Sequence, residues 1–214
     1  MIRRLQPDVM IRDRGVGAWG DQTTPEGWHP FDLYDPRTYG GKPWSVIGGT
    51  GLHPGYSPPE VQRYPKVEEL IHKLVTIVSV GGSLQLGFGP GPDGRFDPKV
   101  VKLLEEIGGW LRVNGEAIYA TRPRSVFREG DEIRFTRTKD HKYVYAISLK
   151  WPGEALRLTS VRAREGSKIY LVGSPRALDW AQDSNGLTIQ IPTQLAQNQP
   201  TQHTYAFKIE VAGP

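Results

Sequence analysis

The sharpest constraint in this sequence is a change of pattern near residue 122. Before it, short apolar runs alternate with longer apolar runs of helical spacing, and after it only short alternating runs separated by turns remain. Strand and helix in alternation are typical of a parallel sheet covered by helices, whereas closely spaced strands are typical of an antiparallel sandwich. The sequence therefore predicts two domains, residues 1–122 and 123–214.

Two helices are expected in the first domain. Apolar residues recur with i, i+3, i+4 and i+7 spacing between Val67 and Val78, and two glycines follow them. A second helix is expected from Pro98, with Asp97 as its N-cap, to Asn114. Its predicted apolar face comprises Val100, Val101, Leu104, Ile107 and Leu111. Strands are expected at residues 7–13, 43–49 and 83–89.

The second domain is predicted to be entirely β. Its alternating runs are separated by polar turns such as Lys139-Asp-His141 and Asp183-Ser-Asn-Gly186. Strands are expected at residues 132–138, 143–149, 155–161, 168–172, 186–191 and 204–211. Their spacing favours an antiparallel sandwich.

Composition excludes several classes of partner. The net charge is only +4, and the 27 basic residues are scattered among 23 acidic ones, so no nucleic-acid partner is expected. The absence of cysteine excludes disulfides and thiol catalysis. His29 and His53 lack the spacing of metal ligands, so neither a metal nor another cofactor is expected. The sequence shows no membrane span or signal peptide, and we expect a soluble chain, cytoplasmic or part of a longer secreted precursor.

The polar residues that could carry chemistry follow the first two predicted strands. Asp13 and Arg14 end the first strand, and the loop after them carries Trp19 and Glu26. The second strand leads into a loop that contains His53. Catalytic residues of β/α barrels lie at the carboxyl ends of strands. Sugars need charged groups for their hydroxyls and flat apolar rings for their C–H faces, and these loops supply both.

Longer strings make this arrangement specific. They are Gln6-Pro-Asp-Val-Met-Ile-Arg-Asp-Arg-Gly15, then Thr24-Pro-Glu26, and above all residues 69–94 and 107–122. In this order they resemble the latter half of the catalytic barrel of the α-L-fucosidases of glycoside hydrolase family 29. The resemblance implies the C-terminal half of a TIM-like (β/α) barrel followed by an all-β antiparallel sandwich. Gly81-Gly-Ser-Leu-Gln-Leu-Gly-Phe88 replaces the family's more usual Gly-Gly-Asn-Leu-Leu-Leu-Asn-Ile, which indicates a distinct subgroup or an altered substrate.

The resemblance also implies a retaining hydrolysis of terminal α-L-fucosyl residues from a glycan or fucoside. Glu26 matches the family's acid/base, and Arg14 matches an arginine that contacts the fucose hydroxyls, with Asp13 orienting it. His53 falls where the family often places an aromatic residue against the fucose methyl group. Trp19 and Trp44 are candidate sugar-stacking residues.

The resemblance places the nucleophilic aspartate on a strand that precedes residue 1. We therefore expect an incomplete active site, to be completed by a complementary N-terminal barrel chain, by the rest of a longer reading frame, or by self-association. The alternative is a non-catalytic carbohydrate-binding or scaffold protein derived from a fucosidase, in which the sandwich is the stable unit.

Overall fold

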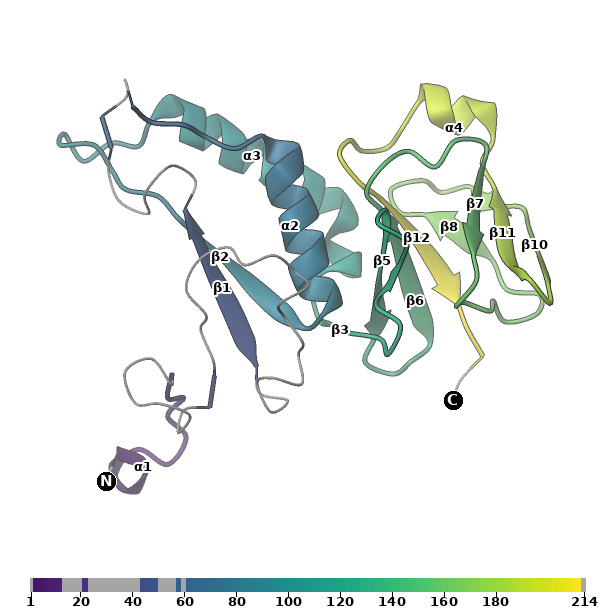
Figure 1. Ribbon diagram of the computed structural model, residues 1–214, viewed down its shortest axis with the longest axis horizontal. Helices are drawn as coiled ribbons and strands as arrows, with labels where there is room; N and C mark the ends of the chain where they lie inside the picture. The colour runs from purple at the N-terminus through teal and green to yellow at the C-terminus, as the bar shows by residue number, and fades with distance from the viewer. Residues whose placement is uncertain (1, 13–20, 23–42, 50–56, 59–60, 213–214) are drawn as a thin grey trace. The chain divides into compact units, whose positions relative to one another are not determined.

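The computed structural model describes residues 2–12, 21–22, 43–49, 57–58 and 61–212 (Figure 1). They form two compact units that interleave along the chain. The first comprises Met1–Tyr64 with Gly81–Asp97, and the second comprises Pro65–Val80 with Pro98–Pro214. Because the units interleave, the predicted domain boundary at residue 123 stays a prediction.

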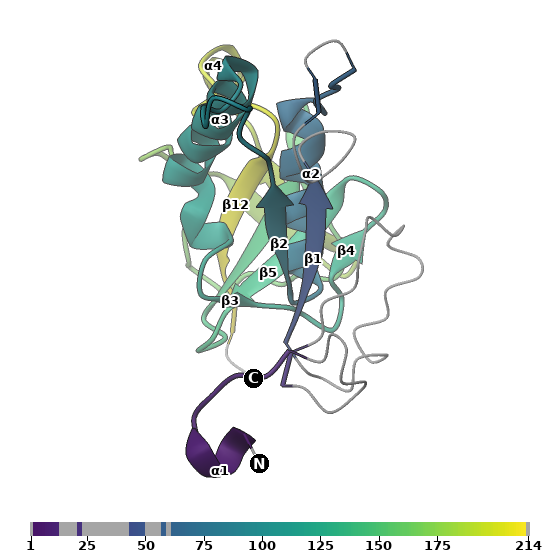
Figure 2. The same cartoon turned by 90° about the vertical axis from the view of Figure 1, so that its left-hand side faces the viewer.

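The first unit is built on two parallel strands, β1 (Trp44–Gly49) and β2 (Gly82–Gly87), whose arrows run the same way in Figure 2. Their register pairs Trp44 with Gly82 and Gly49 with Gly87. Both predicted strands are confirmed with small shifts of their ends. A helical turn, α1 (Ile2–Leu5), lies near the start of the chain.

The strand predicted at residues 7–13 is wrong for its described part. Pro7 and Asp8 form a turn, and residues 9–11 have no regular structure. Arg12 makes a single isolated parallel bridge with Gln22. The apolar run Val9-Met-Ile11 has the composition of a strand, but proline lacks the N–H that a ladder needs.

Helices α2 (Val67–Ser79) and α3 (Pro98–Asn114) belong to the second unit, and the short 3₁₀ helix η4 (Gly115–Ala117) follows α3. Both helices lie where the periodicity predicts them, and α3 begins at Pro98 and ends at Asn114 as expected. Its buried face is partly wrong in the prediction, because Val101 is 42% exposed. The buried residues of α3 are Val100, Leu103, Ile107, Trp110 and Asn114.

The sandwich confirms the predicted antiparallel strands. Its larger sheet has the order β3–β5–β6–β12–β8–β9, with β4 paired to β5, and its smaller sheet has the order β10–β11–β7. The larger sheet contains β3 (Thr121–Arg122), β4 (Arg128–Glu129), β5 (Ile133–Thr138), β6 (Tyr143–Ser148), β8 (Ile169–Leu171), β9 (Ala177–Leu178) and β12 (Tyr205–Glu210). The smaller sheet contains β7 (Ala155–Leu158), β10 (Trp180–Asp183) and β11 (Gly186–Gln190). A short helix, α4 (Thr193–Gln197), lies between β11 and β12.

The core of the second unit lies between these two sheets. Phe135, Phe207 and Ile209 of the larger sheet are fully buried there with Leu158 and Leu187 of the smaller one. Side chains alternate across a strand, so the neighbours of these residues face the other side of the larger sheet.

That other side receives the end of α3 and η4. Thr136 of β5 donates a hydrogen bond to the carbonyl of Ala117 at 2.8 Å, and the Tyr145 hydroxyl donates to Glu116 at 3.1 Å. The indole N–H of Trp110 points to the Thr204 carbonyl at 3.5 Å. Across the residues that the structure describes, we find no helix whose length and apolar content would let it cross a membrane.

Candidate functional site

The carboxyl ends of β1 and β2 form the candidate functional edge. The parallel register places Gly49 beside Gly87, so both strands end at the same edge. This is the edge at which β/α barrels place their catalytic residues. The predicted site residues Asp13, Arg14, Trp19, Glu26 and His53 lie outside the described residues. Their roles stay predictions.

An aromatic pair follows the carboxyl end of β2. The rings of Phe88 and Phe96 pack edge to face with centroids 5.1 Å apart, and Phe96 is 46% exposed. The turn between them is closed by hydrogen bonds from Gly91 N–H to the Arg95 carbonyl at 2.7 Å and from Gly94 N–H to the Gly91 carbonyl at 2.9 Å. The edge therefore carries a partly exposed aromatic pair that the sequence pattern did not predict. The sequence feature that could have indicated this pair is Phe88, which is one of the departures from the usual family string.

A second departure from that string has a structural partner. Gln85 of β2 donates its side-chain amide to the Ser45 hydroxyl of β1 at 3.3 Å, and Gln22 donates to the same oxygen at 3.3 Å. Ser45 is completely buried. A buried hydroxyl needs hydrogen-bond partners, so an amide at position 85 suits a serine on the neighbouring strand.

The side chain of Asp21 forms hydrogen bonds with the segment near the start of the chain. Its carboxylate accepts a hydrogen bond from the Arg3 guanidinium and another from the Ile11 N–H, the latter at 2.9 Å. The Asp21 N–H in turn donates to the Ile11 carbonyl at 2.6 Å. These contacts give the carboxylate a structural role in joining residues 9–12 to residues 21–22.

Trp44 lies at the opposite end of β1 from the candidate edge. Five residues of strand rise separate it from Gly49, a distance of roughly 16 Å. The side chain is 4% exposed, and its ring covers Gly82 so closely that a Cβ there would lie 2.5 Å from the ring. This environment favours a packing role. The predicted sugar contact of Trp44 stays a prediction.

The link between Tyr64 and Asp97 joins two other parts of the first unit. The tyrosine hydroxyl donates to the Asp97 carboxylate at 2.9 Å. Burial, reinforced by this carboxylate, raises the pKa of Tyr64. The bond therefore fixes the chain before α2 to the end of the loop that carries the phenylalanine pair.

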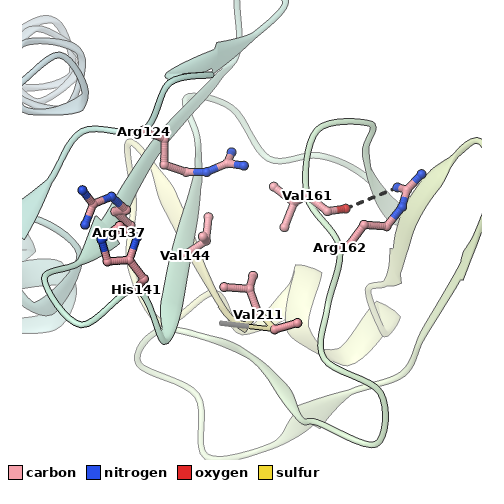
Figure 3. A pocket seen from close by; sticks show the side chains of 8 residues that line it. Arg124, Arg137, His141, Val144, Val161, Arg162 and Val211 are labelled. Atoms are coloured by element: carbon pink, nitrogen blue, oxygen red, sulfur yellow. Dashed lines mark hydrogen bonds between the residues drawn. The ribbon is translucent and has the colours of Figure 1, made fainter. Parts of the chain in front are cut away.

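A hollow of about 240 Å³ opens in the sandwich and is lined by several basic side chains (Figure 3). The Arg124 guanidinium extends towards Val161, donates to the Ser160 carbonyl at 2.9 Å and lies 5.0 Å from the Phe135 ring centroid. Burial lowers the pKa of Arg124, and nearby Glu129 opposes this shift. The Arg162 guanidinium is turned away from Arg124 in Figure 3, where it donates to the Val161 carbonyl at 3.4 Å. It also donates to the Ser184 carbonyl at 3.1 Å. These side chains do not converge on one point, so the hollow is explained by packing around Arg124.

The described residues show no group of three or more histidine, aspartate or glutamate side chains placed to hold a metal ion.

Comparison with known proteins assigns the fold. The Alpha-L-fucosidase family model matches residues 1–116, and the Alpha-L-fucosidase C-terminal domain model matches residues 129–210. The fold is thus that of a glycosidase: part of a (β/α) barrel followed by an antiparallel sandwich. The chain belongs to the alpha-L-fucosidase family.

Individual relatives agree with this assignment. The chain is 34% identical to the tissue alpha-L-fucosidase of Mus musculus over 212 residues, which are 96% of this chain and 46% of the mouse protein. It is 34% identical to an alpha-L-fucosidase of Branchiostoma floridae over 69% of this chain and 33% of that protein. The crystal structure of Thermotoga maritima alpha-fucosidase with a mechanism-based inhibitor superimposes with a TM-score of 0.78 and 28% identity, over 97% of this chain and 47% of that one. The chain spans less than half the length of each of these relatives.

Proposed function

We propose that this chain forms the C-terminal part of a retaining α-L-fucosidase that removes terminal α-L-fucosyl residues from glycans or fucosides. The observation that carries the proposal is that two alpha-L-fucosidase models match in the expected order, over residues 1–116 and 129–210. The structural likeness to the Thermotoga maritima enzyme over 97% of the chain supports it.

In this proposal Glu26 is the acid/base. It protonates the leaving oxygen and then deprotonates the attacking water, which requires a pKa raised towards neutrality by burial or by a nearby negative charge. Arg14, oriented by Asp13, holds the fucose hydroxyls with charge-assisted hydrogen bonds. Trp19 and His53 contact the sugar ring in the substrate site.

The nucleophile comes from outside these 214 residues. Double displacement needs a second carboxylate on the opposite face of the sugar ring, and the family pattern places it on an earlier barrel strand. We propose that a complementary N-terminal barrel segment supplies this nucleophilic carboxylate. Self-association is the weaker source, because two copies would bring two Glu26 residues and no family nucleophile.

The test of this proposal is the hydrolysis of an aryl α-L-fucoside by the chain alone and by the chain mixed with the N-terminal barrel half of a relative. We expect turnover in the mixture only, with retention of the anomeric configuration in the first-formed fucose. Turnover by the chain alone would contradict the placement of the nucleophile. Inversion would contradict the retaining mechanism.

Glu26→Ala in the same mixture tests the acid/base. We expect hydrolysis of a natural fucosyl glycan to fall by roughly 10²–10⁴-fold, the range of general acid catalysis. An aryl fucoside should lose less, because its leaving group needs less protonation. Glu116→Ala is the matched control, since Glu116 lies in η4 and binds Tyr145 and Lys208. Equal losses on both substrates would contradict the role of Glu26.

A further inference from the structure

The face of the larger sheet that points away from the sandwich core carries a row of tyrosines and charged side chains. Strands β6, β12 and β8 are neighbours in this sheet, and Lys208 lies opposite Tyr145 on one side and Tyr170 on the other. Glu210 lies opposite Tyr143. Phe207 and Ile209 of β12 point into the core, so Lys208 and Glu210 point to the other face.

A hollow of about 360 Å³ lies on this face, within the size range of small-molecule sites. Two partly exposed tyrosines from different strands, Tyr143 and Tyr170, line it. Its remaining lining residues are Arg164, Gly166, Ser167, Lys168, Lys208 and Glu210. The buried Tyr145 is not available to a ligand, because its hydroxyl binds Glu116 beneath η4.

The charges that line this hollow are largely paired within the protein. Arg164 binds Glu210 with a shortest distance of 2.9 Å, and Lys208 binds Glu116 at 2.6 Å. Among the described lining residues, Lys168 is the only cation without a carboxylate at salt-bridge distance. Because two of the three lining cations are already paired, an anion would find only Lys168 free and would have to compete with Glu116 and Glu210 for the other two, so the hollow favours a ligand without net charge.

The two tyrosine rings have different surroundings. The ammonium groups of Lys142 and Lys208 lie 5.2 and 4.9 Å from the Tyr143 ring centroid, so cations already occupy its surroundings. In the described part of the chain, no such contact is made with Tyr170, which is partly exposed. Tyr170 is therefore the better stacking platform, and Tyr143 forms the adjacent wall.

The hollow is also lined by a residue whose hydroxyl lacks a partner. Ser167 is only 8% exposed, and its Oγ makes no hydrogen bond, although its carbonyl accepts one from the Trp180 indole at 3.1 Å. Buried polar groups are normally hydrogen-bonded. The wall of the hollow therefore contains one hydroxyl whose hydrogen-bonding capacity is unused.

We propose that this hollow, here called the tyrosine pocket, binds a neutral pyranose unit of a glycan chain. The ring's C–H face stacks on Tyr170, while the Arg164–Glu210 pair donates to and accepts from its hydroxyls. The pocket lies in the second unit and uses none of the residues assigned to fucose hydrolysis. The sandwich thus holds part of the glycan independently of the candidate catalytic edge.

The test is saturation-transfer NMR with lactose and 2′-fucosyllactose on the full chain. We expect both to bind, because the pocket takes the neutral sugar and not the fucose. Binding should persist in an Arg14→Ala/Glu26→Ala variant, and Tyr170→Ala should weaken it by about tenfold, which corresponds to the loss of one aromatic contact. Tyr170→Phe should bind as the wild type does. Tyr119→Ala is the matched control, because Tyr119 is 62% exposed and does not line the pocket.

Several results would overturn the inference. One is the absence of transfer to either sugar at millimolar concentration, and another is unchanged binding by a Tyr170→Ala variant with the wild-type melting temperature. Loss of lactose binding only in the Arg14→Ala/Glu26→Ala variant would also overturn it while supporting the proposed barrel site. Tighter, salt-sensitive binding of a sulfated oligosaccharide would contradict the neutral ligand class. If Tyr170→Ala fails to fold, equal binding by Lys168→Ala, Arg164→Ala and the wild type would overturn the assignment.

Discussion

At the scale of single residues, the contact between Trp44 and Gly82 shows why a glycine begins β2. The paired positions of the two strands bring the indole ring over the glycine, where a Cβ would lie 2.5 Å from it. The ring has little freedom to move, because Trp44 is 4% exposed. Of the two glycines after α2, Gly81 adopts a φ of 83°, and Gly82 makes room for the Trp44 ring.

The first prediction follows from this contact. Gly82→Ala should destabilise the protein by about 1–3 kcal/mol, because the added methyl group overpacks a buried site. Urea unfolding followed by tryptophan fluorescence measures the change. Gly108→Ala is the control: its nearest neighbour is a flexible Arg112 nitrogen at 3.7 Å, and alanine is the better helix former. A Gly82→Ala variant as stable as the wild type would contradict the packing role.

At the scale of elements, Glu129 of β4 fixes the chain that leaves β7. Its carboxylate accepts hydrogen bonds from the N–H groups of Thr159 and Ser160, at 2.8 and 2.6 Å. Burial of the carboxyl group raises the pKa, but the hydrogen bonds from Ser160 and Thr159 outweigh it, so the pKa of Glu129 lies below its ordinary value of 4.5. The ionised carboxylate is therefore the form that the sandwich stabilises.

A pH dependence of stability follows. A pKa that is lower in the folded state contributes stability above the unfolded value, and this contribution disappears as pH falls through the folded value. We expect the free energy of unfolding to decrease as the pH is lowered below about 4.5. The free energy of unfolding of a Glu129→Gln variant should be lower than that of the wild type by about 1–3 kcal/mol at pH 7. It should also decrease less than that of the wild type as the pH is lowered. Urea unfolding at a series of pH values checks this, and parallel curves for the two proteins would refute it.

Helix α3 shows the limit of periodicity at this scale. Leu103 and Leu104 are adjacent, and the pattern admits either residue to the apolar face. The structure buries Leu103 together with Val100, Ile107 and Trp110, and it leaves Val101 exposed. Spacing predicts that a helix forms, but the partner surface decides how the helix is rotated.

At the scale of the whole molecule, the second unit joins helices to the sandwich through a shared interface. His203, in the loop before β12, binds Glu106 of α3 through its ring at 3.0 Å, and its carbonyl contacts the His72 ring of α2 at 3.1 Å. Asn114 also donates to the Thr201 hydroxyl at 3.3 Å. The sandwich face that receives these helices includes completely buried Thr136 and Ala206.

Truncation tests whether the sandwich folds without the helix that covers it. A chain of residues 123–214 should unfold at a lower urea concentration than one of residues 98–214. Removing α3 and η4 exposes Tyr145 and leaves the Thr136 hydroxyl without its Ala117 partner, and β3 is lost from beside β5 with them. Binding of a hydrophobic dye should rise in parallel. Equal midpoints would instead support residue 123 as the boundary of an independently folding domain.

Local sequence was sufficient to predict β1, β2, most strands of the sandwich, α2 and α3, because periodicity depends on residues only a few positions apart. It failed at residues 7–12, where the expected strand is absent. The family strings pointed to the correct family. The buried face of α3, the partner of Trp44 and the tyrosine pocket depended on the tertiary structure. The pocket needs β6, β8 and β12 side by side, although β6 and β12 are more than fifty residues apart in the sequence. Pairing at that separation is decided by packing across the whole unit, which no local pattern encodes.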